Sequence, residues 1–174
     1  MDLASIHLAL RITARISLIF FVWAFSAAGL ARLIPASSTR WLEKNRRNAV
    51  LVFATSHTVH FGFILALAAK MGAAQFIQTF TWVTVIGGGG AFLLIWGLAW
   101  KTLPQRTSAT EGDSRFDAFA YYYVWSIFTL AYVGASFRAR FYVPFGFVVV
   151  AALLIRLTAA WQSRRLANVS PAAD

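Results

Sequence analysis

The chain has 174 residues, of which 59% are hydrophobic and 13% are charged, whereas a soluble domain carries roughly 25% charged residues. There is no cysteine, which excludes disulfides, iron–sulfur clusters and thiol catalysis. The 16 basic residues outnumber the six acidic ones, but basic residues collect in the cytoplasmic loops of membrane proteins, so we expect membrane lipids and no nucleic acid as partners.

Five apolar blocks follow one another along the chain, each of about 20 residues, the length that crosses the hydrocarbon core. They cover about residues 16–34 (with an earlier start left open), 48–69, 80–100, 117–136 and 142–161. In lipid, such blocks are helices, because a helix satisfies all its own backbone polar groups. The sequence therefore predicts an all-α protein in which residues 1–174 form a single domain, an integral membrane bundle of five transmembrane helices.

The distribution of basic residues predicts the orientation of this bundle. The first and third loops share a side with the C-terminus, and that side carries Arg32, Arg40, Lys44, Arg46, Arg47, Lys101, Arg106, Arg115, Arg164 and Arg165. The other side carries Lys70, Arg138 and Arg140, with Arg11 and Arg15 if the N-terminal segment lies there. This bias predicts an outside N-terminus and a cytoplasmic C-terminus. Arg156, inside the fifth block, is expected to reach towards the cytoplasmic face.

Two features of the third and fourth blocks bear on function. The four glycines Gly87–Gly90 indicate either a flexible point or a close approach by another helix or a flat ligand, and no P-loop, because no Lys-Ser/Thr follows. Asp117 is the acidic residue nearest to a span, and we interpret it as the N-cap of the fourth helix, beside Ser114. The scarcity of acidic residues in the spans and the lack of a visible repeat make a transporter the weakest hypothesis.

The second block contains the most informative residues, His57 and His60. They follow Arg47 by ten and thirteen residues, which places them about 15 and 20 Å along a helix and on roughly the same face. Ionisable groups at membrane depth are usually functional, and imidazole is a common ligand of haem iron. Alternatively, both histidines only hold neighbouring helices together by bonding to Ser, Thr or Tyr.

A haem iron takes its two axial ligands from opposite faces, so neighbouring histidines on one helix cannot supply both. The remaining histidine is His7, near the outer end of the first helix if that helix starts early. A His7–His60 pair is therefore a candidate set of metal ligands. Arg11 and Arg15 continue the same polar helical stripe and are candidates for binding haem propionates. The alternative is that His7 is an interfacial residue.

The Arg46-Arg47 pair, followed by His60 thirteen residues after Arg47, resembles the ferric-reductase-like transmembrane family. The likeness is greatest to its small bacterial branch, which includes the haem-binding membrane subunit of the periplasmic methionine sulfoxide reductase system. Residues 11–32, 88–94 and 116–125 resemble other helices of this family, so the likeness covers most of the chain. It implies a b-type haem held between histidines of non-adjacent helices, in the bacterial inner membrane.

The chain departs from the family pattern in the fourth block. Phe116-Asp117 stands where the family commonly has Leu-His, and Leu130 stands where a second histidine often falls. No histidine follows His60, so the usual ligand partner is missing. No flavin or NADPH domain is recognisable either, so electrons are expected from a separate donor.

Two hypotheses follow. In the first, the chain is a membrane haem b protein that passes electrons to an acceptor on the outer side, with no catalytic residue of its own assigned. Its cofactor-binding residues would be His60, His57, His7, Arg11, Arg15 and Arg47, with His60 and His7 on the metal. In the second, it is a non-catalytic accessory subunit of a larger membrane complex, built on the same scaffold without haem.

Overall fold

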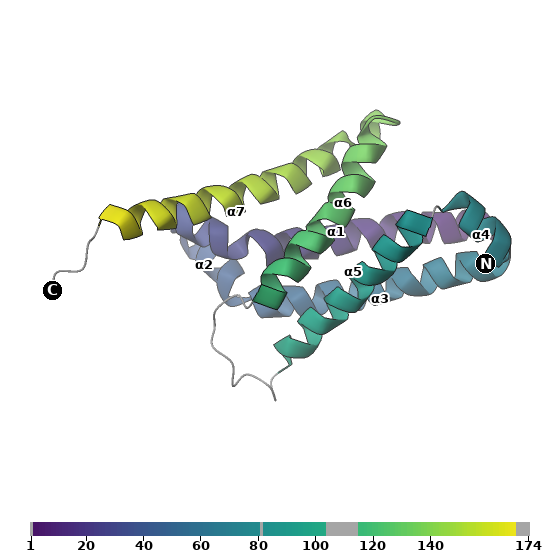
Figure 1. The fold of residues 1–174 in the computed structure, drawn as a ribbon, viewed down its shortest axis with the longest axis horizontal. Helices are drawn as coiled ribbons and strands as arrows, with labels where there is room; N and C mark the ends of the chain where they lie inside the picture. Colours follow the sequence, from purple (N-terminus) through teal and green to yellow (C-terminus); the bar gives the residue numbers. More distant parts are fainter. Residues whose placement is uncertain (1, 81, 104–114, 170–174) are drawn as a thin grey trace. The chain divides into compact units, whose positions relative to one another are not determined.

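The computed structural model describes residues 2–80, 82–103 and 115–169, without the side chains of residues 82, 83, 167 and 169. Most of the predicted polar loop that follows Thr102, with Arg106 and Ser114, lies outside this part of the chain. The described residues form helices and no strand, which confirms the all-α prediction. The helices in chain order are α1 (Leu3–Leu33), α2 (Ser37–Lys44), α3 (Arg46–Met71), α4 (Ala73–Thr79), α5 (Trp82–Thr102), α6 (Arg115–Ser136), the 3₁₀ helix η2 (Arg140–Tyr142) and α7 (Val143–Val169) (Figure 1).

Four of these helices are long and apolar enough to cross a membrane. Within the described residues the candidate spans are Leu3–Leu33, Arg46–Met71, Thr84–Thr102 and Arg140–Leu166. The fourth predicted span also forms a helix, α6, but it is less apolar because tyrosines at 121, 122, 123 and 132 replace aliphatic residues. The structure therefore indicates a helical membrane protein, while the arrangement of five spans stays a prediction.

The first helix takes the earlier of its two expected starts. The Asp2 carboxylate accepts a hydrogen bond of 2.7 Å from the backbone N–H of Ser5, as an N-cap residue does. The helix then continues through His7, Arg11 and Arg15, because arginine is a good helix former whatever its cost in hydropathy. It ends at Leu33, two residues before Pro35, whose ring disfavours helical geometry in the residue before it.

A short helix that hydropathy does not predict, α2, occupies the first loop. The Thr39 hydroxyl donates to the Ile34 carbonyl (2.6 Å) and accepts from the backbone N–H of Ala36 (3.1 Å), which ties the start of α2 to the end of α1. Trp23 of α1 stacks on Trp41 of α2, with ring centroids 5.4 Å apart, and its indole N–H donates to the Leu42 carbonyl. The first loop is therefore an ordered structural element.

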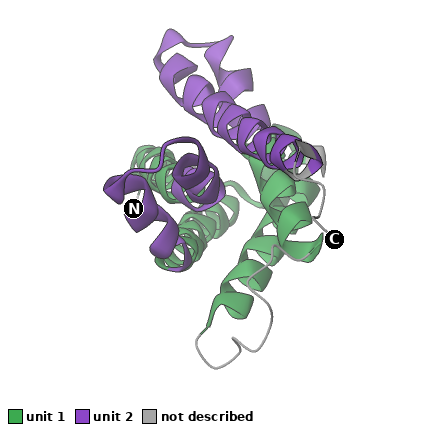
Figure 2. Cartoon of the chain, turned by 90° about the vertical axis from the view of Figure 1, so that its left-hand side faces the viewer, with its two compact units in different colours: residues 1–21, 48–128 green, residues 22–47, 129–174 purple. Residues whose placement is uncertain are grey.

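The chain divides into two compact units, drawn in green and purple in Figure 2. Unit 1 contains residues 1–21 and 48–128. Its core includes three phenylalanines from three helices: Phe21 of α1 lies 5.4 Å from Phe53 of α3 and 5.0 Å from Phe128 of α6, between ring centroids. Phe21 and Phe53 are almost fully buried. This aromatic cluster joins the three helices around the segment that carries the histidines.

The glycine run of α5 is a place of close helix approach in unit 1. Tyr123 of α6 donates its hydroxyl to the Gly87 carbonyl (3.1 Å), and a Cβ added at Gly90 would lie 2.8 Å from the same hydroxyl oxygen. A Cβ at Gly88 or Gly89 would meet nothing within 4 Å. The expected close approach by another helix is therefore found at Gly87 and Gly90, whereas Gly88 and Gly89 face open space; flexibility of the run stays a prediction.

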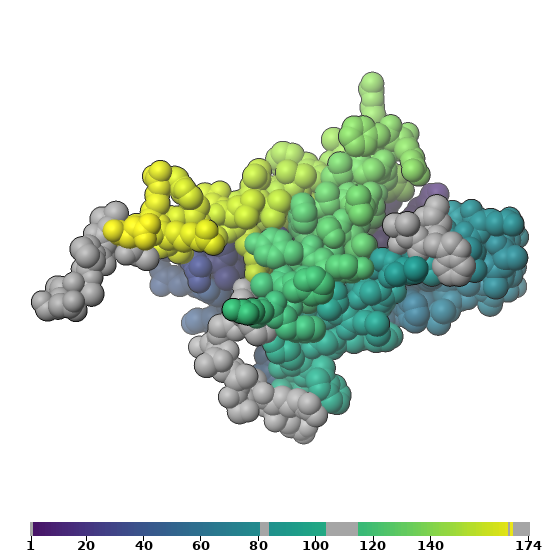
Figure 3. All heavy atoms as spheres, viewed as in Figure 1, coloured from purple at the N-terminus to yellow at the C-terminus, as the bar shows by residue number. Residues whose placement is uncertain are grey.

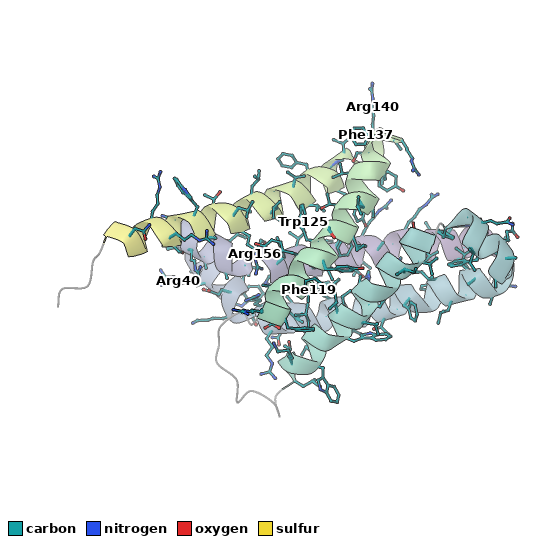
Figure 4. All side chains as sticks on the ribbon, viewed as in Figure 1. Arg40, Phe119, Trp125, Phe137, Arg140 and Arg156 are labelled. Carbon is teal, nitrogen blue, oxygen red and sulfur yellow. The ribbon has the colours of Figure 1, made fainter. Side chains whose placement is uncertain are left out.

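Unit 2 contains residues 22–47 and 129–174. Two arginines donate to neighbouring carbonyls of α1: Arg46 Nε to Ala24 (3.0 Å) and Arg156 Nη1 to Phe25 (3.2 Å; Figure 4). A Cβ at Gly29 would lie 3.1 Å from the Ile155 side chain, so α7 lies close to α1 here. Arg156 therefore lies at the level of the first residue of α3, which is the predicted cytoplasmic boundary.

The surface of α7 carries large exposed apolar side chains between Val143 and Trp161. Phe147 is 73% exposed and Leu154 is 57% exposed, and the helix lies open on the face drawn in Figure 3. The exposed Phe137 follows the end of α6, close to Arg140 at the start of η2 (Figure 4). Large apolar side chains exposed along a span-length helix are expected where lipid or another protein replaces water.

The two sides of the glycine run predict opposite effects of the same substitution. Gly89→Ala should leave stability unchanged or raise it by up to about 1 kcal/mol, because alanine is the better helix former and the site is open. Gly90→Ala should lower it by about 1–3 kcal/mol, because the new methyl group overlaps the Tyr123 hydroxyl. Thermal unfolding of both variants in detergent measures the difference, and equal melting temperatures would contradict the α5–α6 approach.

Candidate functional site

His57 and His60 lie on one face of α3, as their spacing predicts. Their rings are nearly parallel, with centroids 5.3 Å apart and an interplanar angle of 25°. Both side chains are partly buried in unit 1. The structure thus brings two of the six candidate cofactor residues into direct contact.

His60 is oriented by α1. Its Nδ1 lies 2.9 Å from the hydroxyl oxygen of Thr13. The same hydroxyl oxygen lies 2.7 Å from the carbonyl oxygen of Ala9, which can only accept, so the single hydroxyl proton is directed to Ala9. With the hydroxyl proton there, we infer that His60 Nδ1 donates to Thr13. This geometry assigns the proton of a neutral His60 ring to Nδ1 and leaves a lone pair on Nε2.

His57 has aromatic surroundings instead of a polar partner. Its ring stacks on Phe92 of α5, with centroids 4.6 Å apart, and lies 5.4 Å from Phe53 and 5.8 Å from Phe128. Its Nδ1 is buried and has no hydrogen-bond partner among the described residues. A buried polar atom without a partner costs free energy, and such atoms in folded proteins usually bind a water, an ion or a ligand.

Further hydrogen bonds attach this part of α3 to its neighbours. The hydroxyl groups of Ser56 and Ser17 of α1 lie 3.1 Å apart, and the Trp96 indole N–H of α5 donates to the Thr58 hydroxyl (2.9 Å). These residues therefore join helices without the histidines. In the part of the chain that the structure describes, His60 alone of the two histidines contacts a hydroxyl of a neighbouring helix, as the alternative interpretation predicts. His60 also joins helices through Nδ1, but this role does not use its Nε2.

The other candidate residues are more distant in the fold. His7 is exposed, and it precedes Thr13 by six residues, which is about 9 Å along α1. Six residues make roughly one and two-thirds turns, so the two side chains leave α1 on different sides. The structure therefore does not bring His7 into contact with His60. Arg11 is exposed, Arg15 is partly buried, and Arg47 is the second residue of α3.

Thr13 is the site residue that the sequence does not reveal. A threonine between two arginines in a long helix carries no signal of its own, and its role depends on which turn of α1 faces His60. The sequence does not reveal the positions of Phe92 and Phe128 beside His57 either, because two phenylalanines among 16 are not distinctive until the packing of the helices is known.

The interpretation of Asp117 as the N-cap of the fourth helix is wrong. Helix α6 begins at Arg115, so Asp117 is its third residue, and its carboxylate pairs with the Lys101 ammonium at the end of α5. A carboxylate in the first turn of a helix is favoured by the helix dipole. Asp117 thus contributes to the α5–α6 contact in unit 1.

Within the described ranges no group of three or more His, Cys, Asp or Glu side chains gathers as a metal site. A haem iron needs only one or two axial imidazoles, because the porphyrin supplies the other four ligands. Comparison of the chain with family models, curated proteins and solved structures gave no match.

The bond between Thr13 and His60 predicts a cost for an isosteric change. Thr13→Val keeps the shape but removes the hydroxyl that His60 Nδ1 contacts, so stability should fall by about 1–3 kcal/mol. Thr55→Val is the matched control, because Thr55 is exposed and its hydroxyl bonds only to the Leu51 carbonyl of its own helix. Thermal unfolding of both variants checks this, and equal losses would contradict the assigned bond.

Proposed function

We propose that the chain is a membrane b-type haem protein of the ferric-reductase-like kind, which passes electrons across the bacterial inner membrane to an acceptor on the outer side. In this proposal α6 is the fifth span, the N-terminus is outside and the C-terminus is cytoplasmic. The single observation that supports it is the 2.9 Å contact between His60 Nδ1 and the Thr13 hydroxyl, because an Nδ1 that donates there leaves the Nε2 lone pair for a ligand.

The residues around His60 fit a haem. The ring nitrogen opposite a bound Nδ1–H is the usual iron ligand, and a fixed Nδ1–H holds the ring in one orientation. Thr58 meets Trp96 and Phe61 meets Phe92, so α3 and α5 run antiparallel here. The open glycines Gly88 and Gly89 precede Phe92 by one turn on α5, and a Cβ at either would meet nothing within 4 Å. We propose that this open side of α5 accommodates the flat ring.

Each side chain has a role in this proposal. A bound haem would supply one-electron cycling between ferric and ferrous iron. His60 would bind the iron, Thr13 would hold the His60 ring, and the apolar rings around His57 would exclude water. His57 Nδ1 would remain for a hydrogen bond to the ligand or to a water beside it. Arg11 and Arg15 are the proposed propionate partners.

The structure also bears on the number of axial ligands. His7 is exposed and lies on a different side of α1 from Thr13. A His7–His60 pair would therefore require α1 to rotate. We therefore propose one histidine ligand, His60, in place of two. A separate redox partner would deliver the electrons.

The second candidate function is that of a haem-free accessory subunit in a larger membrane complex. The observation that favours it is the absence of a second histidine opposite His60 among the described residues, combined with the exposed apolar surfaces of the helices. On this hypothesis His60 serves only to attach α3 to α1. The two candidates predict opposite spectra.

The reduced-minus-oxidised absorption spectrum of the purified protein separates them. We expect a b-type α-band in the wild type that is lost in His60→Ala. It should remain in His7→Ala, the matched control, because His7 is exposed and has no contact with His60. A wild type without any haem band, after expression with ample haem, would establish the accessory hypothesis instead, and a band that survives in His60→Ala would contradict the proposed ligand.

A further inference from the structure

The helix α2 presents a basic hollow at the end of a membrane span. The hollow has a volume of about 440 Å³ and is lined by Ser37, Arg40, Trp41 and Lys44. A helix turns roughly 100° per residue, so these four positions fall within about 100° of one another on the helix surface. Glu43, the only acidic residue of α2, lies about 110° from the centre of this face. The hollow is therefore positively charged on one side of the helix.

The groups in the hollow are available and held in place. Arg40, labelled in Figure 4, and Lys44 are exposed and form no ion pair with any residue that the structure describes. Trp41 is 55% exposed although its ring stacks on Trp23. The Thr39 and Trp23 hydrogen bonds attach the backbone of α2 to α1, so the four side chains project from a fixed helix.

The position of α2 identifies the surrounding chemistry. It lies between α1 and α3, two helices of membrane-spanning length, so a chain that crosses the membrane there places α2 at a membrane–water boundary. Tryptophan is enriched at that boundary, and arginine and lysine there attract the phosphates of anionic lipids. A guanidinium, an ammonium and a hydroxyl on one face supply charge-assisted and neutral donors to a single phosphate group.

We propose that this hollow binds the phosphate headgroup of an anionic phospholipid. Arg40 and Lys44 donate to the phosphate oxygens, Ser37 donates its hydroxyl, and Trp41 lies against the glycerol and upper acyl region. The inference rests on the membrane location in the proposed function and does not depend on haem. The absence of haem would therefore leave it intact.

Native mass spectrometry of the full-length protein in detergent tests this proposal, with phosphatidylglycerol and phosphatidylcholine added in equal amounts. The wild type should retain phosphatidylglycerol in preference to phosphatidylcholine. R40Q/K44Q should bind phosphatidylglycerol at least about 10-fold more weakly, because two charge-assisted bonds are lost. R164Q/R165Q, the matched control, removes the same charge from exposed positions on α7 and should bind as the wild type does.

Four results would overturn the proposal. Equal retention of the two lipids by the wild type would exclude selectivity for an anionic headgroup. Unchanged binding in R40Q/K44Q would exclude the hollow, and an equal loss in both double variants would indicate a general effect of charge. Displacement of the lipid by an equal concentration of inorganic phosphate would identify a site for free phosphate. Arg40→Lys keeps the charge and should retain most binding, which separates loss of the site from loss of the fold.

Discussion

A partly buried histidine on an apolar helix has two ring nitrogens that need hydrogen-bond partners, and the contact between α1 and α3 in unit 1 depends on how His60 finds one. One nitrogen of His60 is bonded to Thr13, whose own proton is directed to the carbonyl of Ala9. The chain of bonds from α1 backbone to hydroxyl to imidazole has one direction, because a carbonyl cannot donate. It fixes the contact between α1 and α3 and decides which nitrogen of His60 remains for other chemistry.

The helix α1 provides this partner and several others. Its first part supplies Thr13 and Ser17 to α3, and its second part offers the carbonyls of Ala24 and Phe25 to Arg46 and Arg156. Small residues let other parts of the chain approach the backbone of the second part closely. Ala24 and Ala27 are fully buried, and the missing side chain of Gly29 leaves room for α7. In each unit α1 thus offers partners to several polar groups of neighbouring helices, which matters where lipid offers no donor or acceptor.

Much of this organisation follows from sequence alone, because hydropathy and helical periodicity are local properties. Each of the five apolar blocks corresponds to one long helix, and the three-residue spacing of His57 and His60 places their rings together. The start of α1 is less certain from the sequence, because the cost of arginine in hydropathy hides its good helix propensity. The pairing of Thr13 with His60, and of Asp117 with Lys101, depends on which turns of two helices face each other, and a single sequence contains no measure of that.

The most direct test of the account is the protonation of the His60 ring, measured by nitrogen NMR on histidine-labelled protein before and after addition of zinc protoporphyrin, a diamagnetic analogue of haem. The account predicts a proton on Nδ1, a bare Nε2, and a shift of the Nε2 resonance of His60 when the porphyrin binds. The His60→Ala variant identifies the signal. A proton on Nε2 in the free protein, or a porphyrin that leaves the resonance of His60 unmoved, would contradict the account.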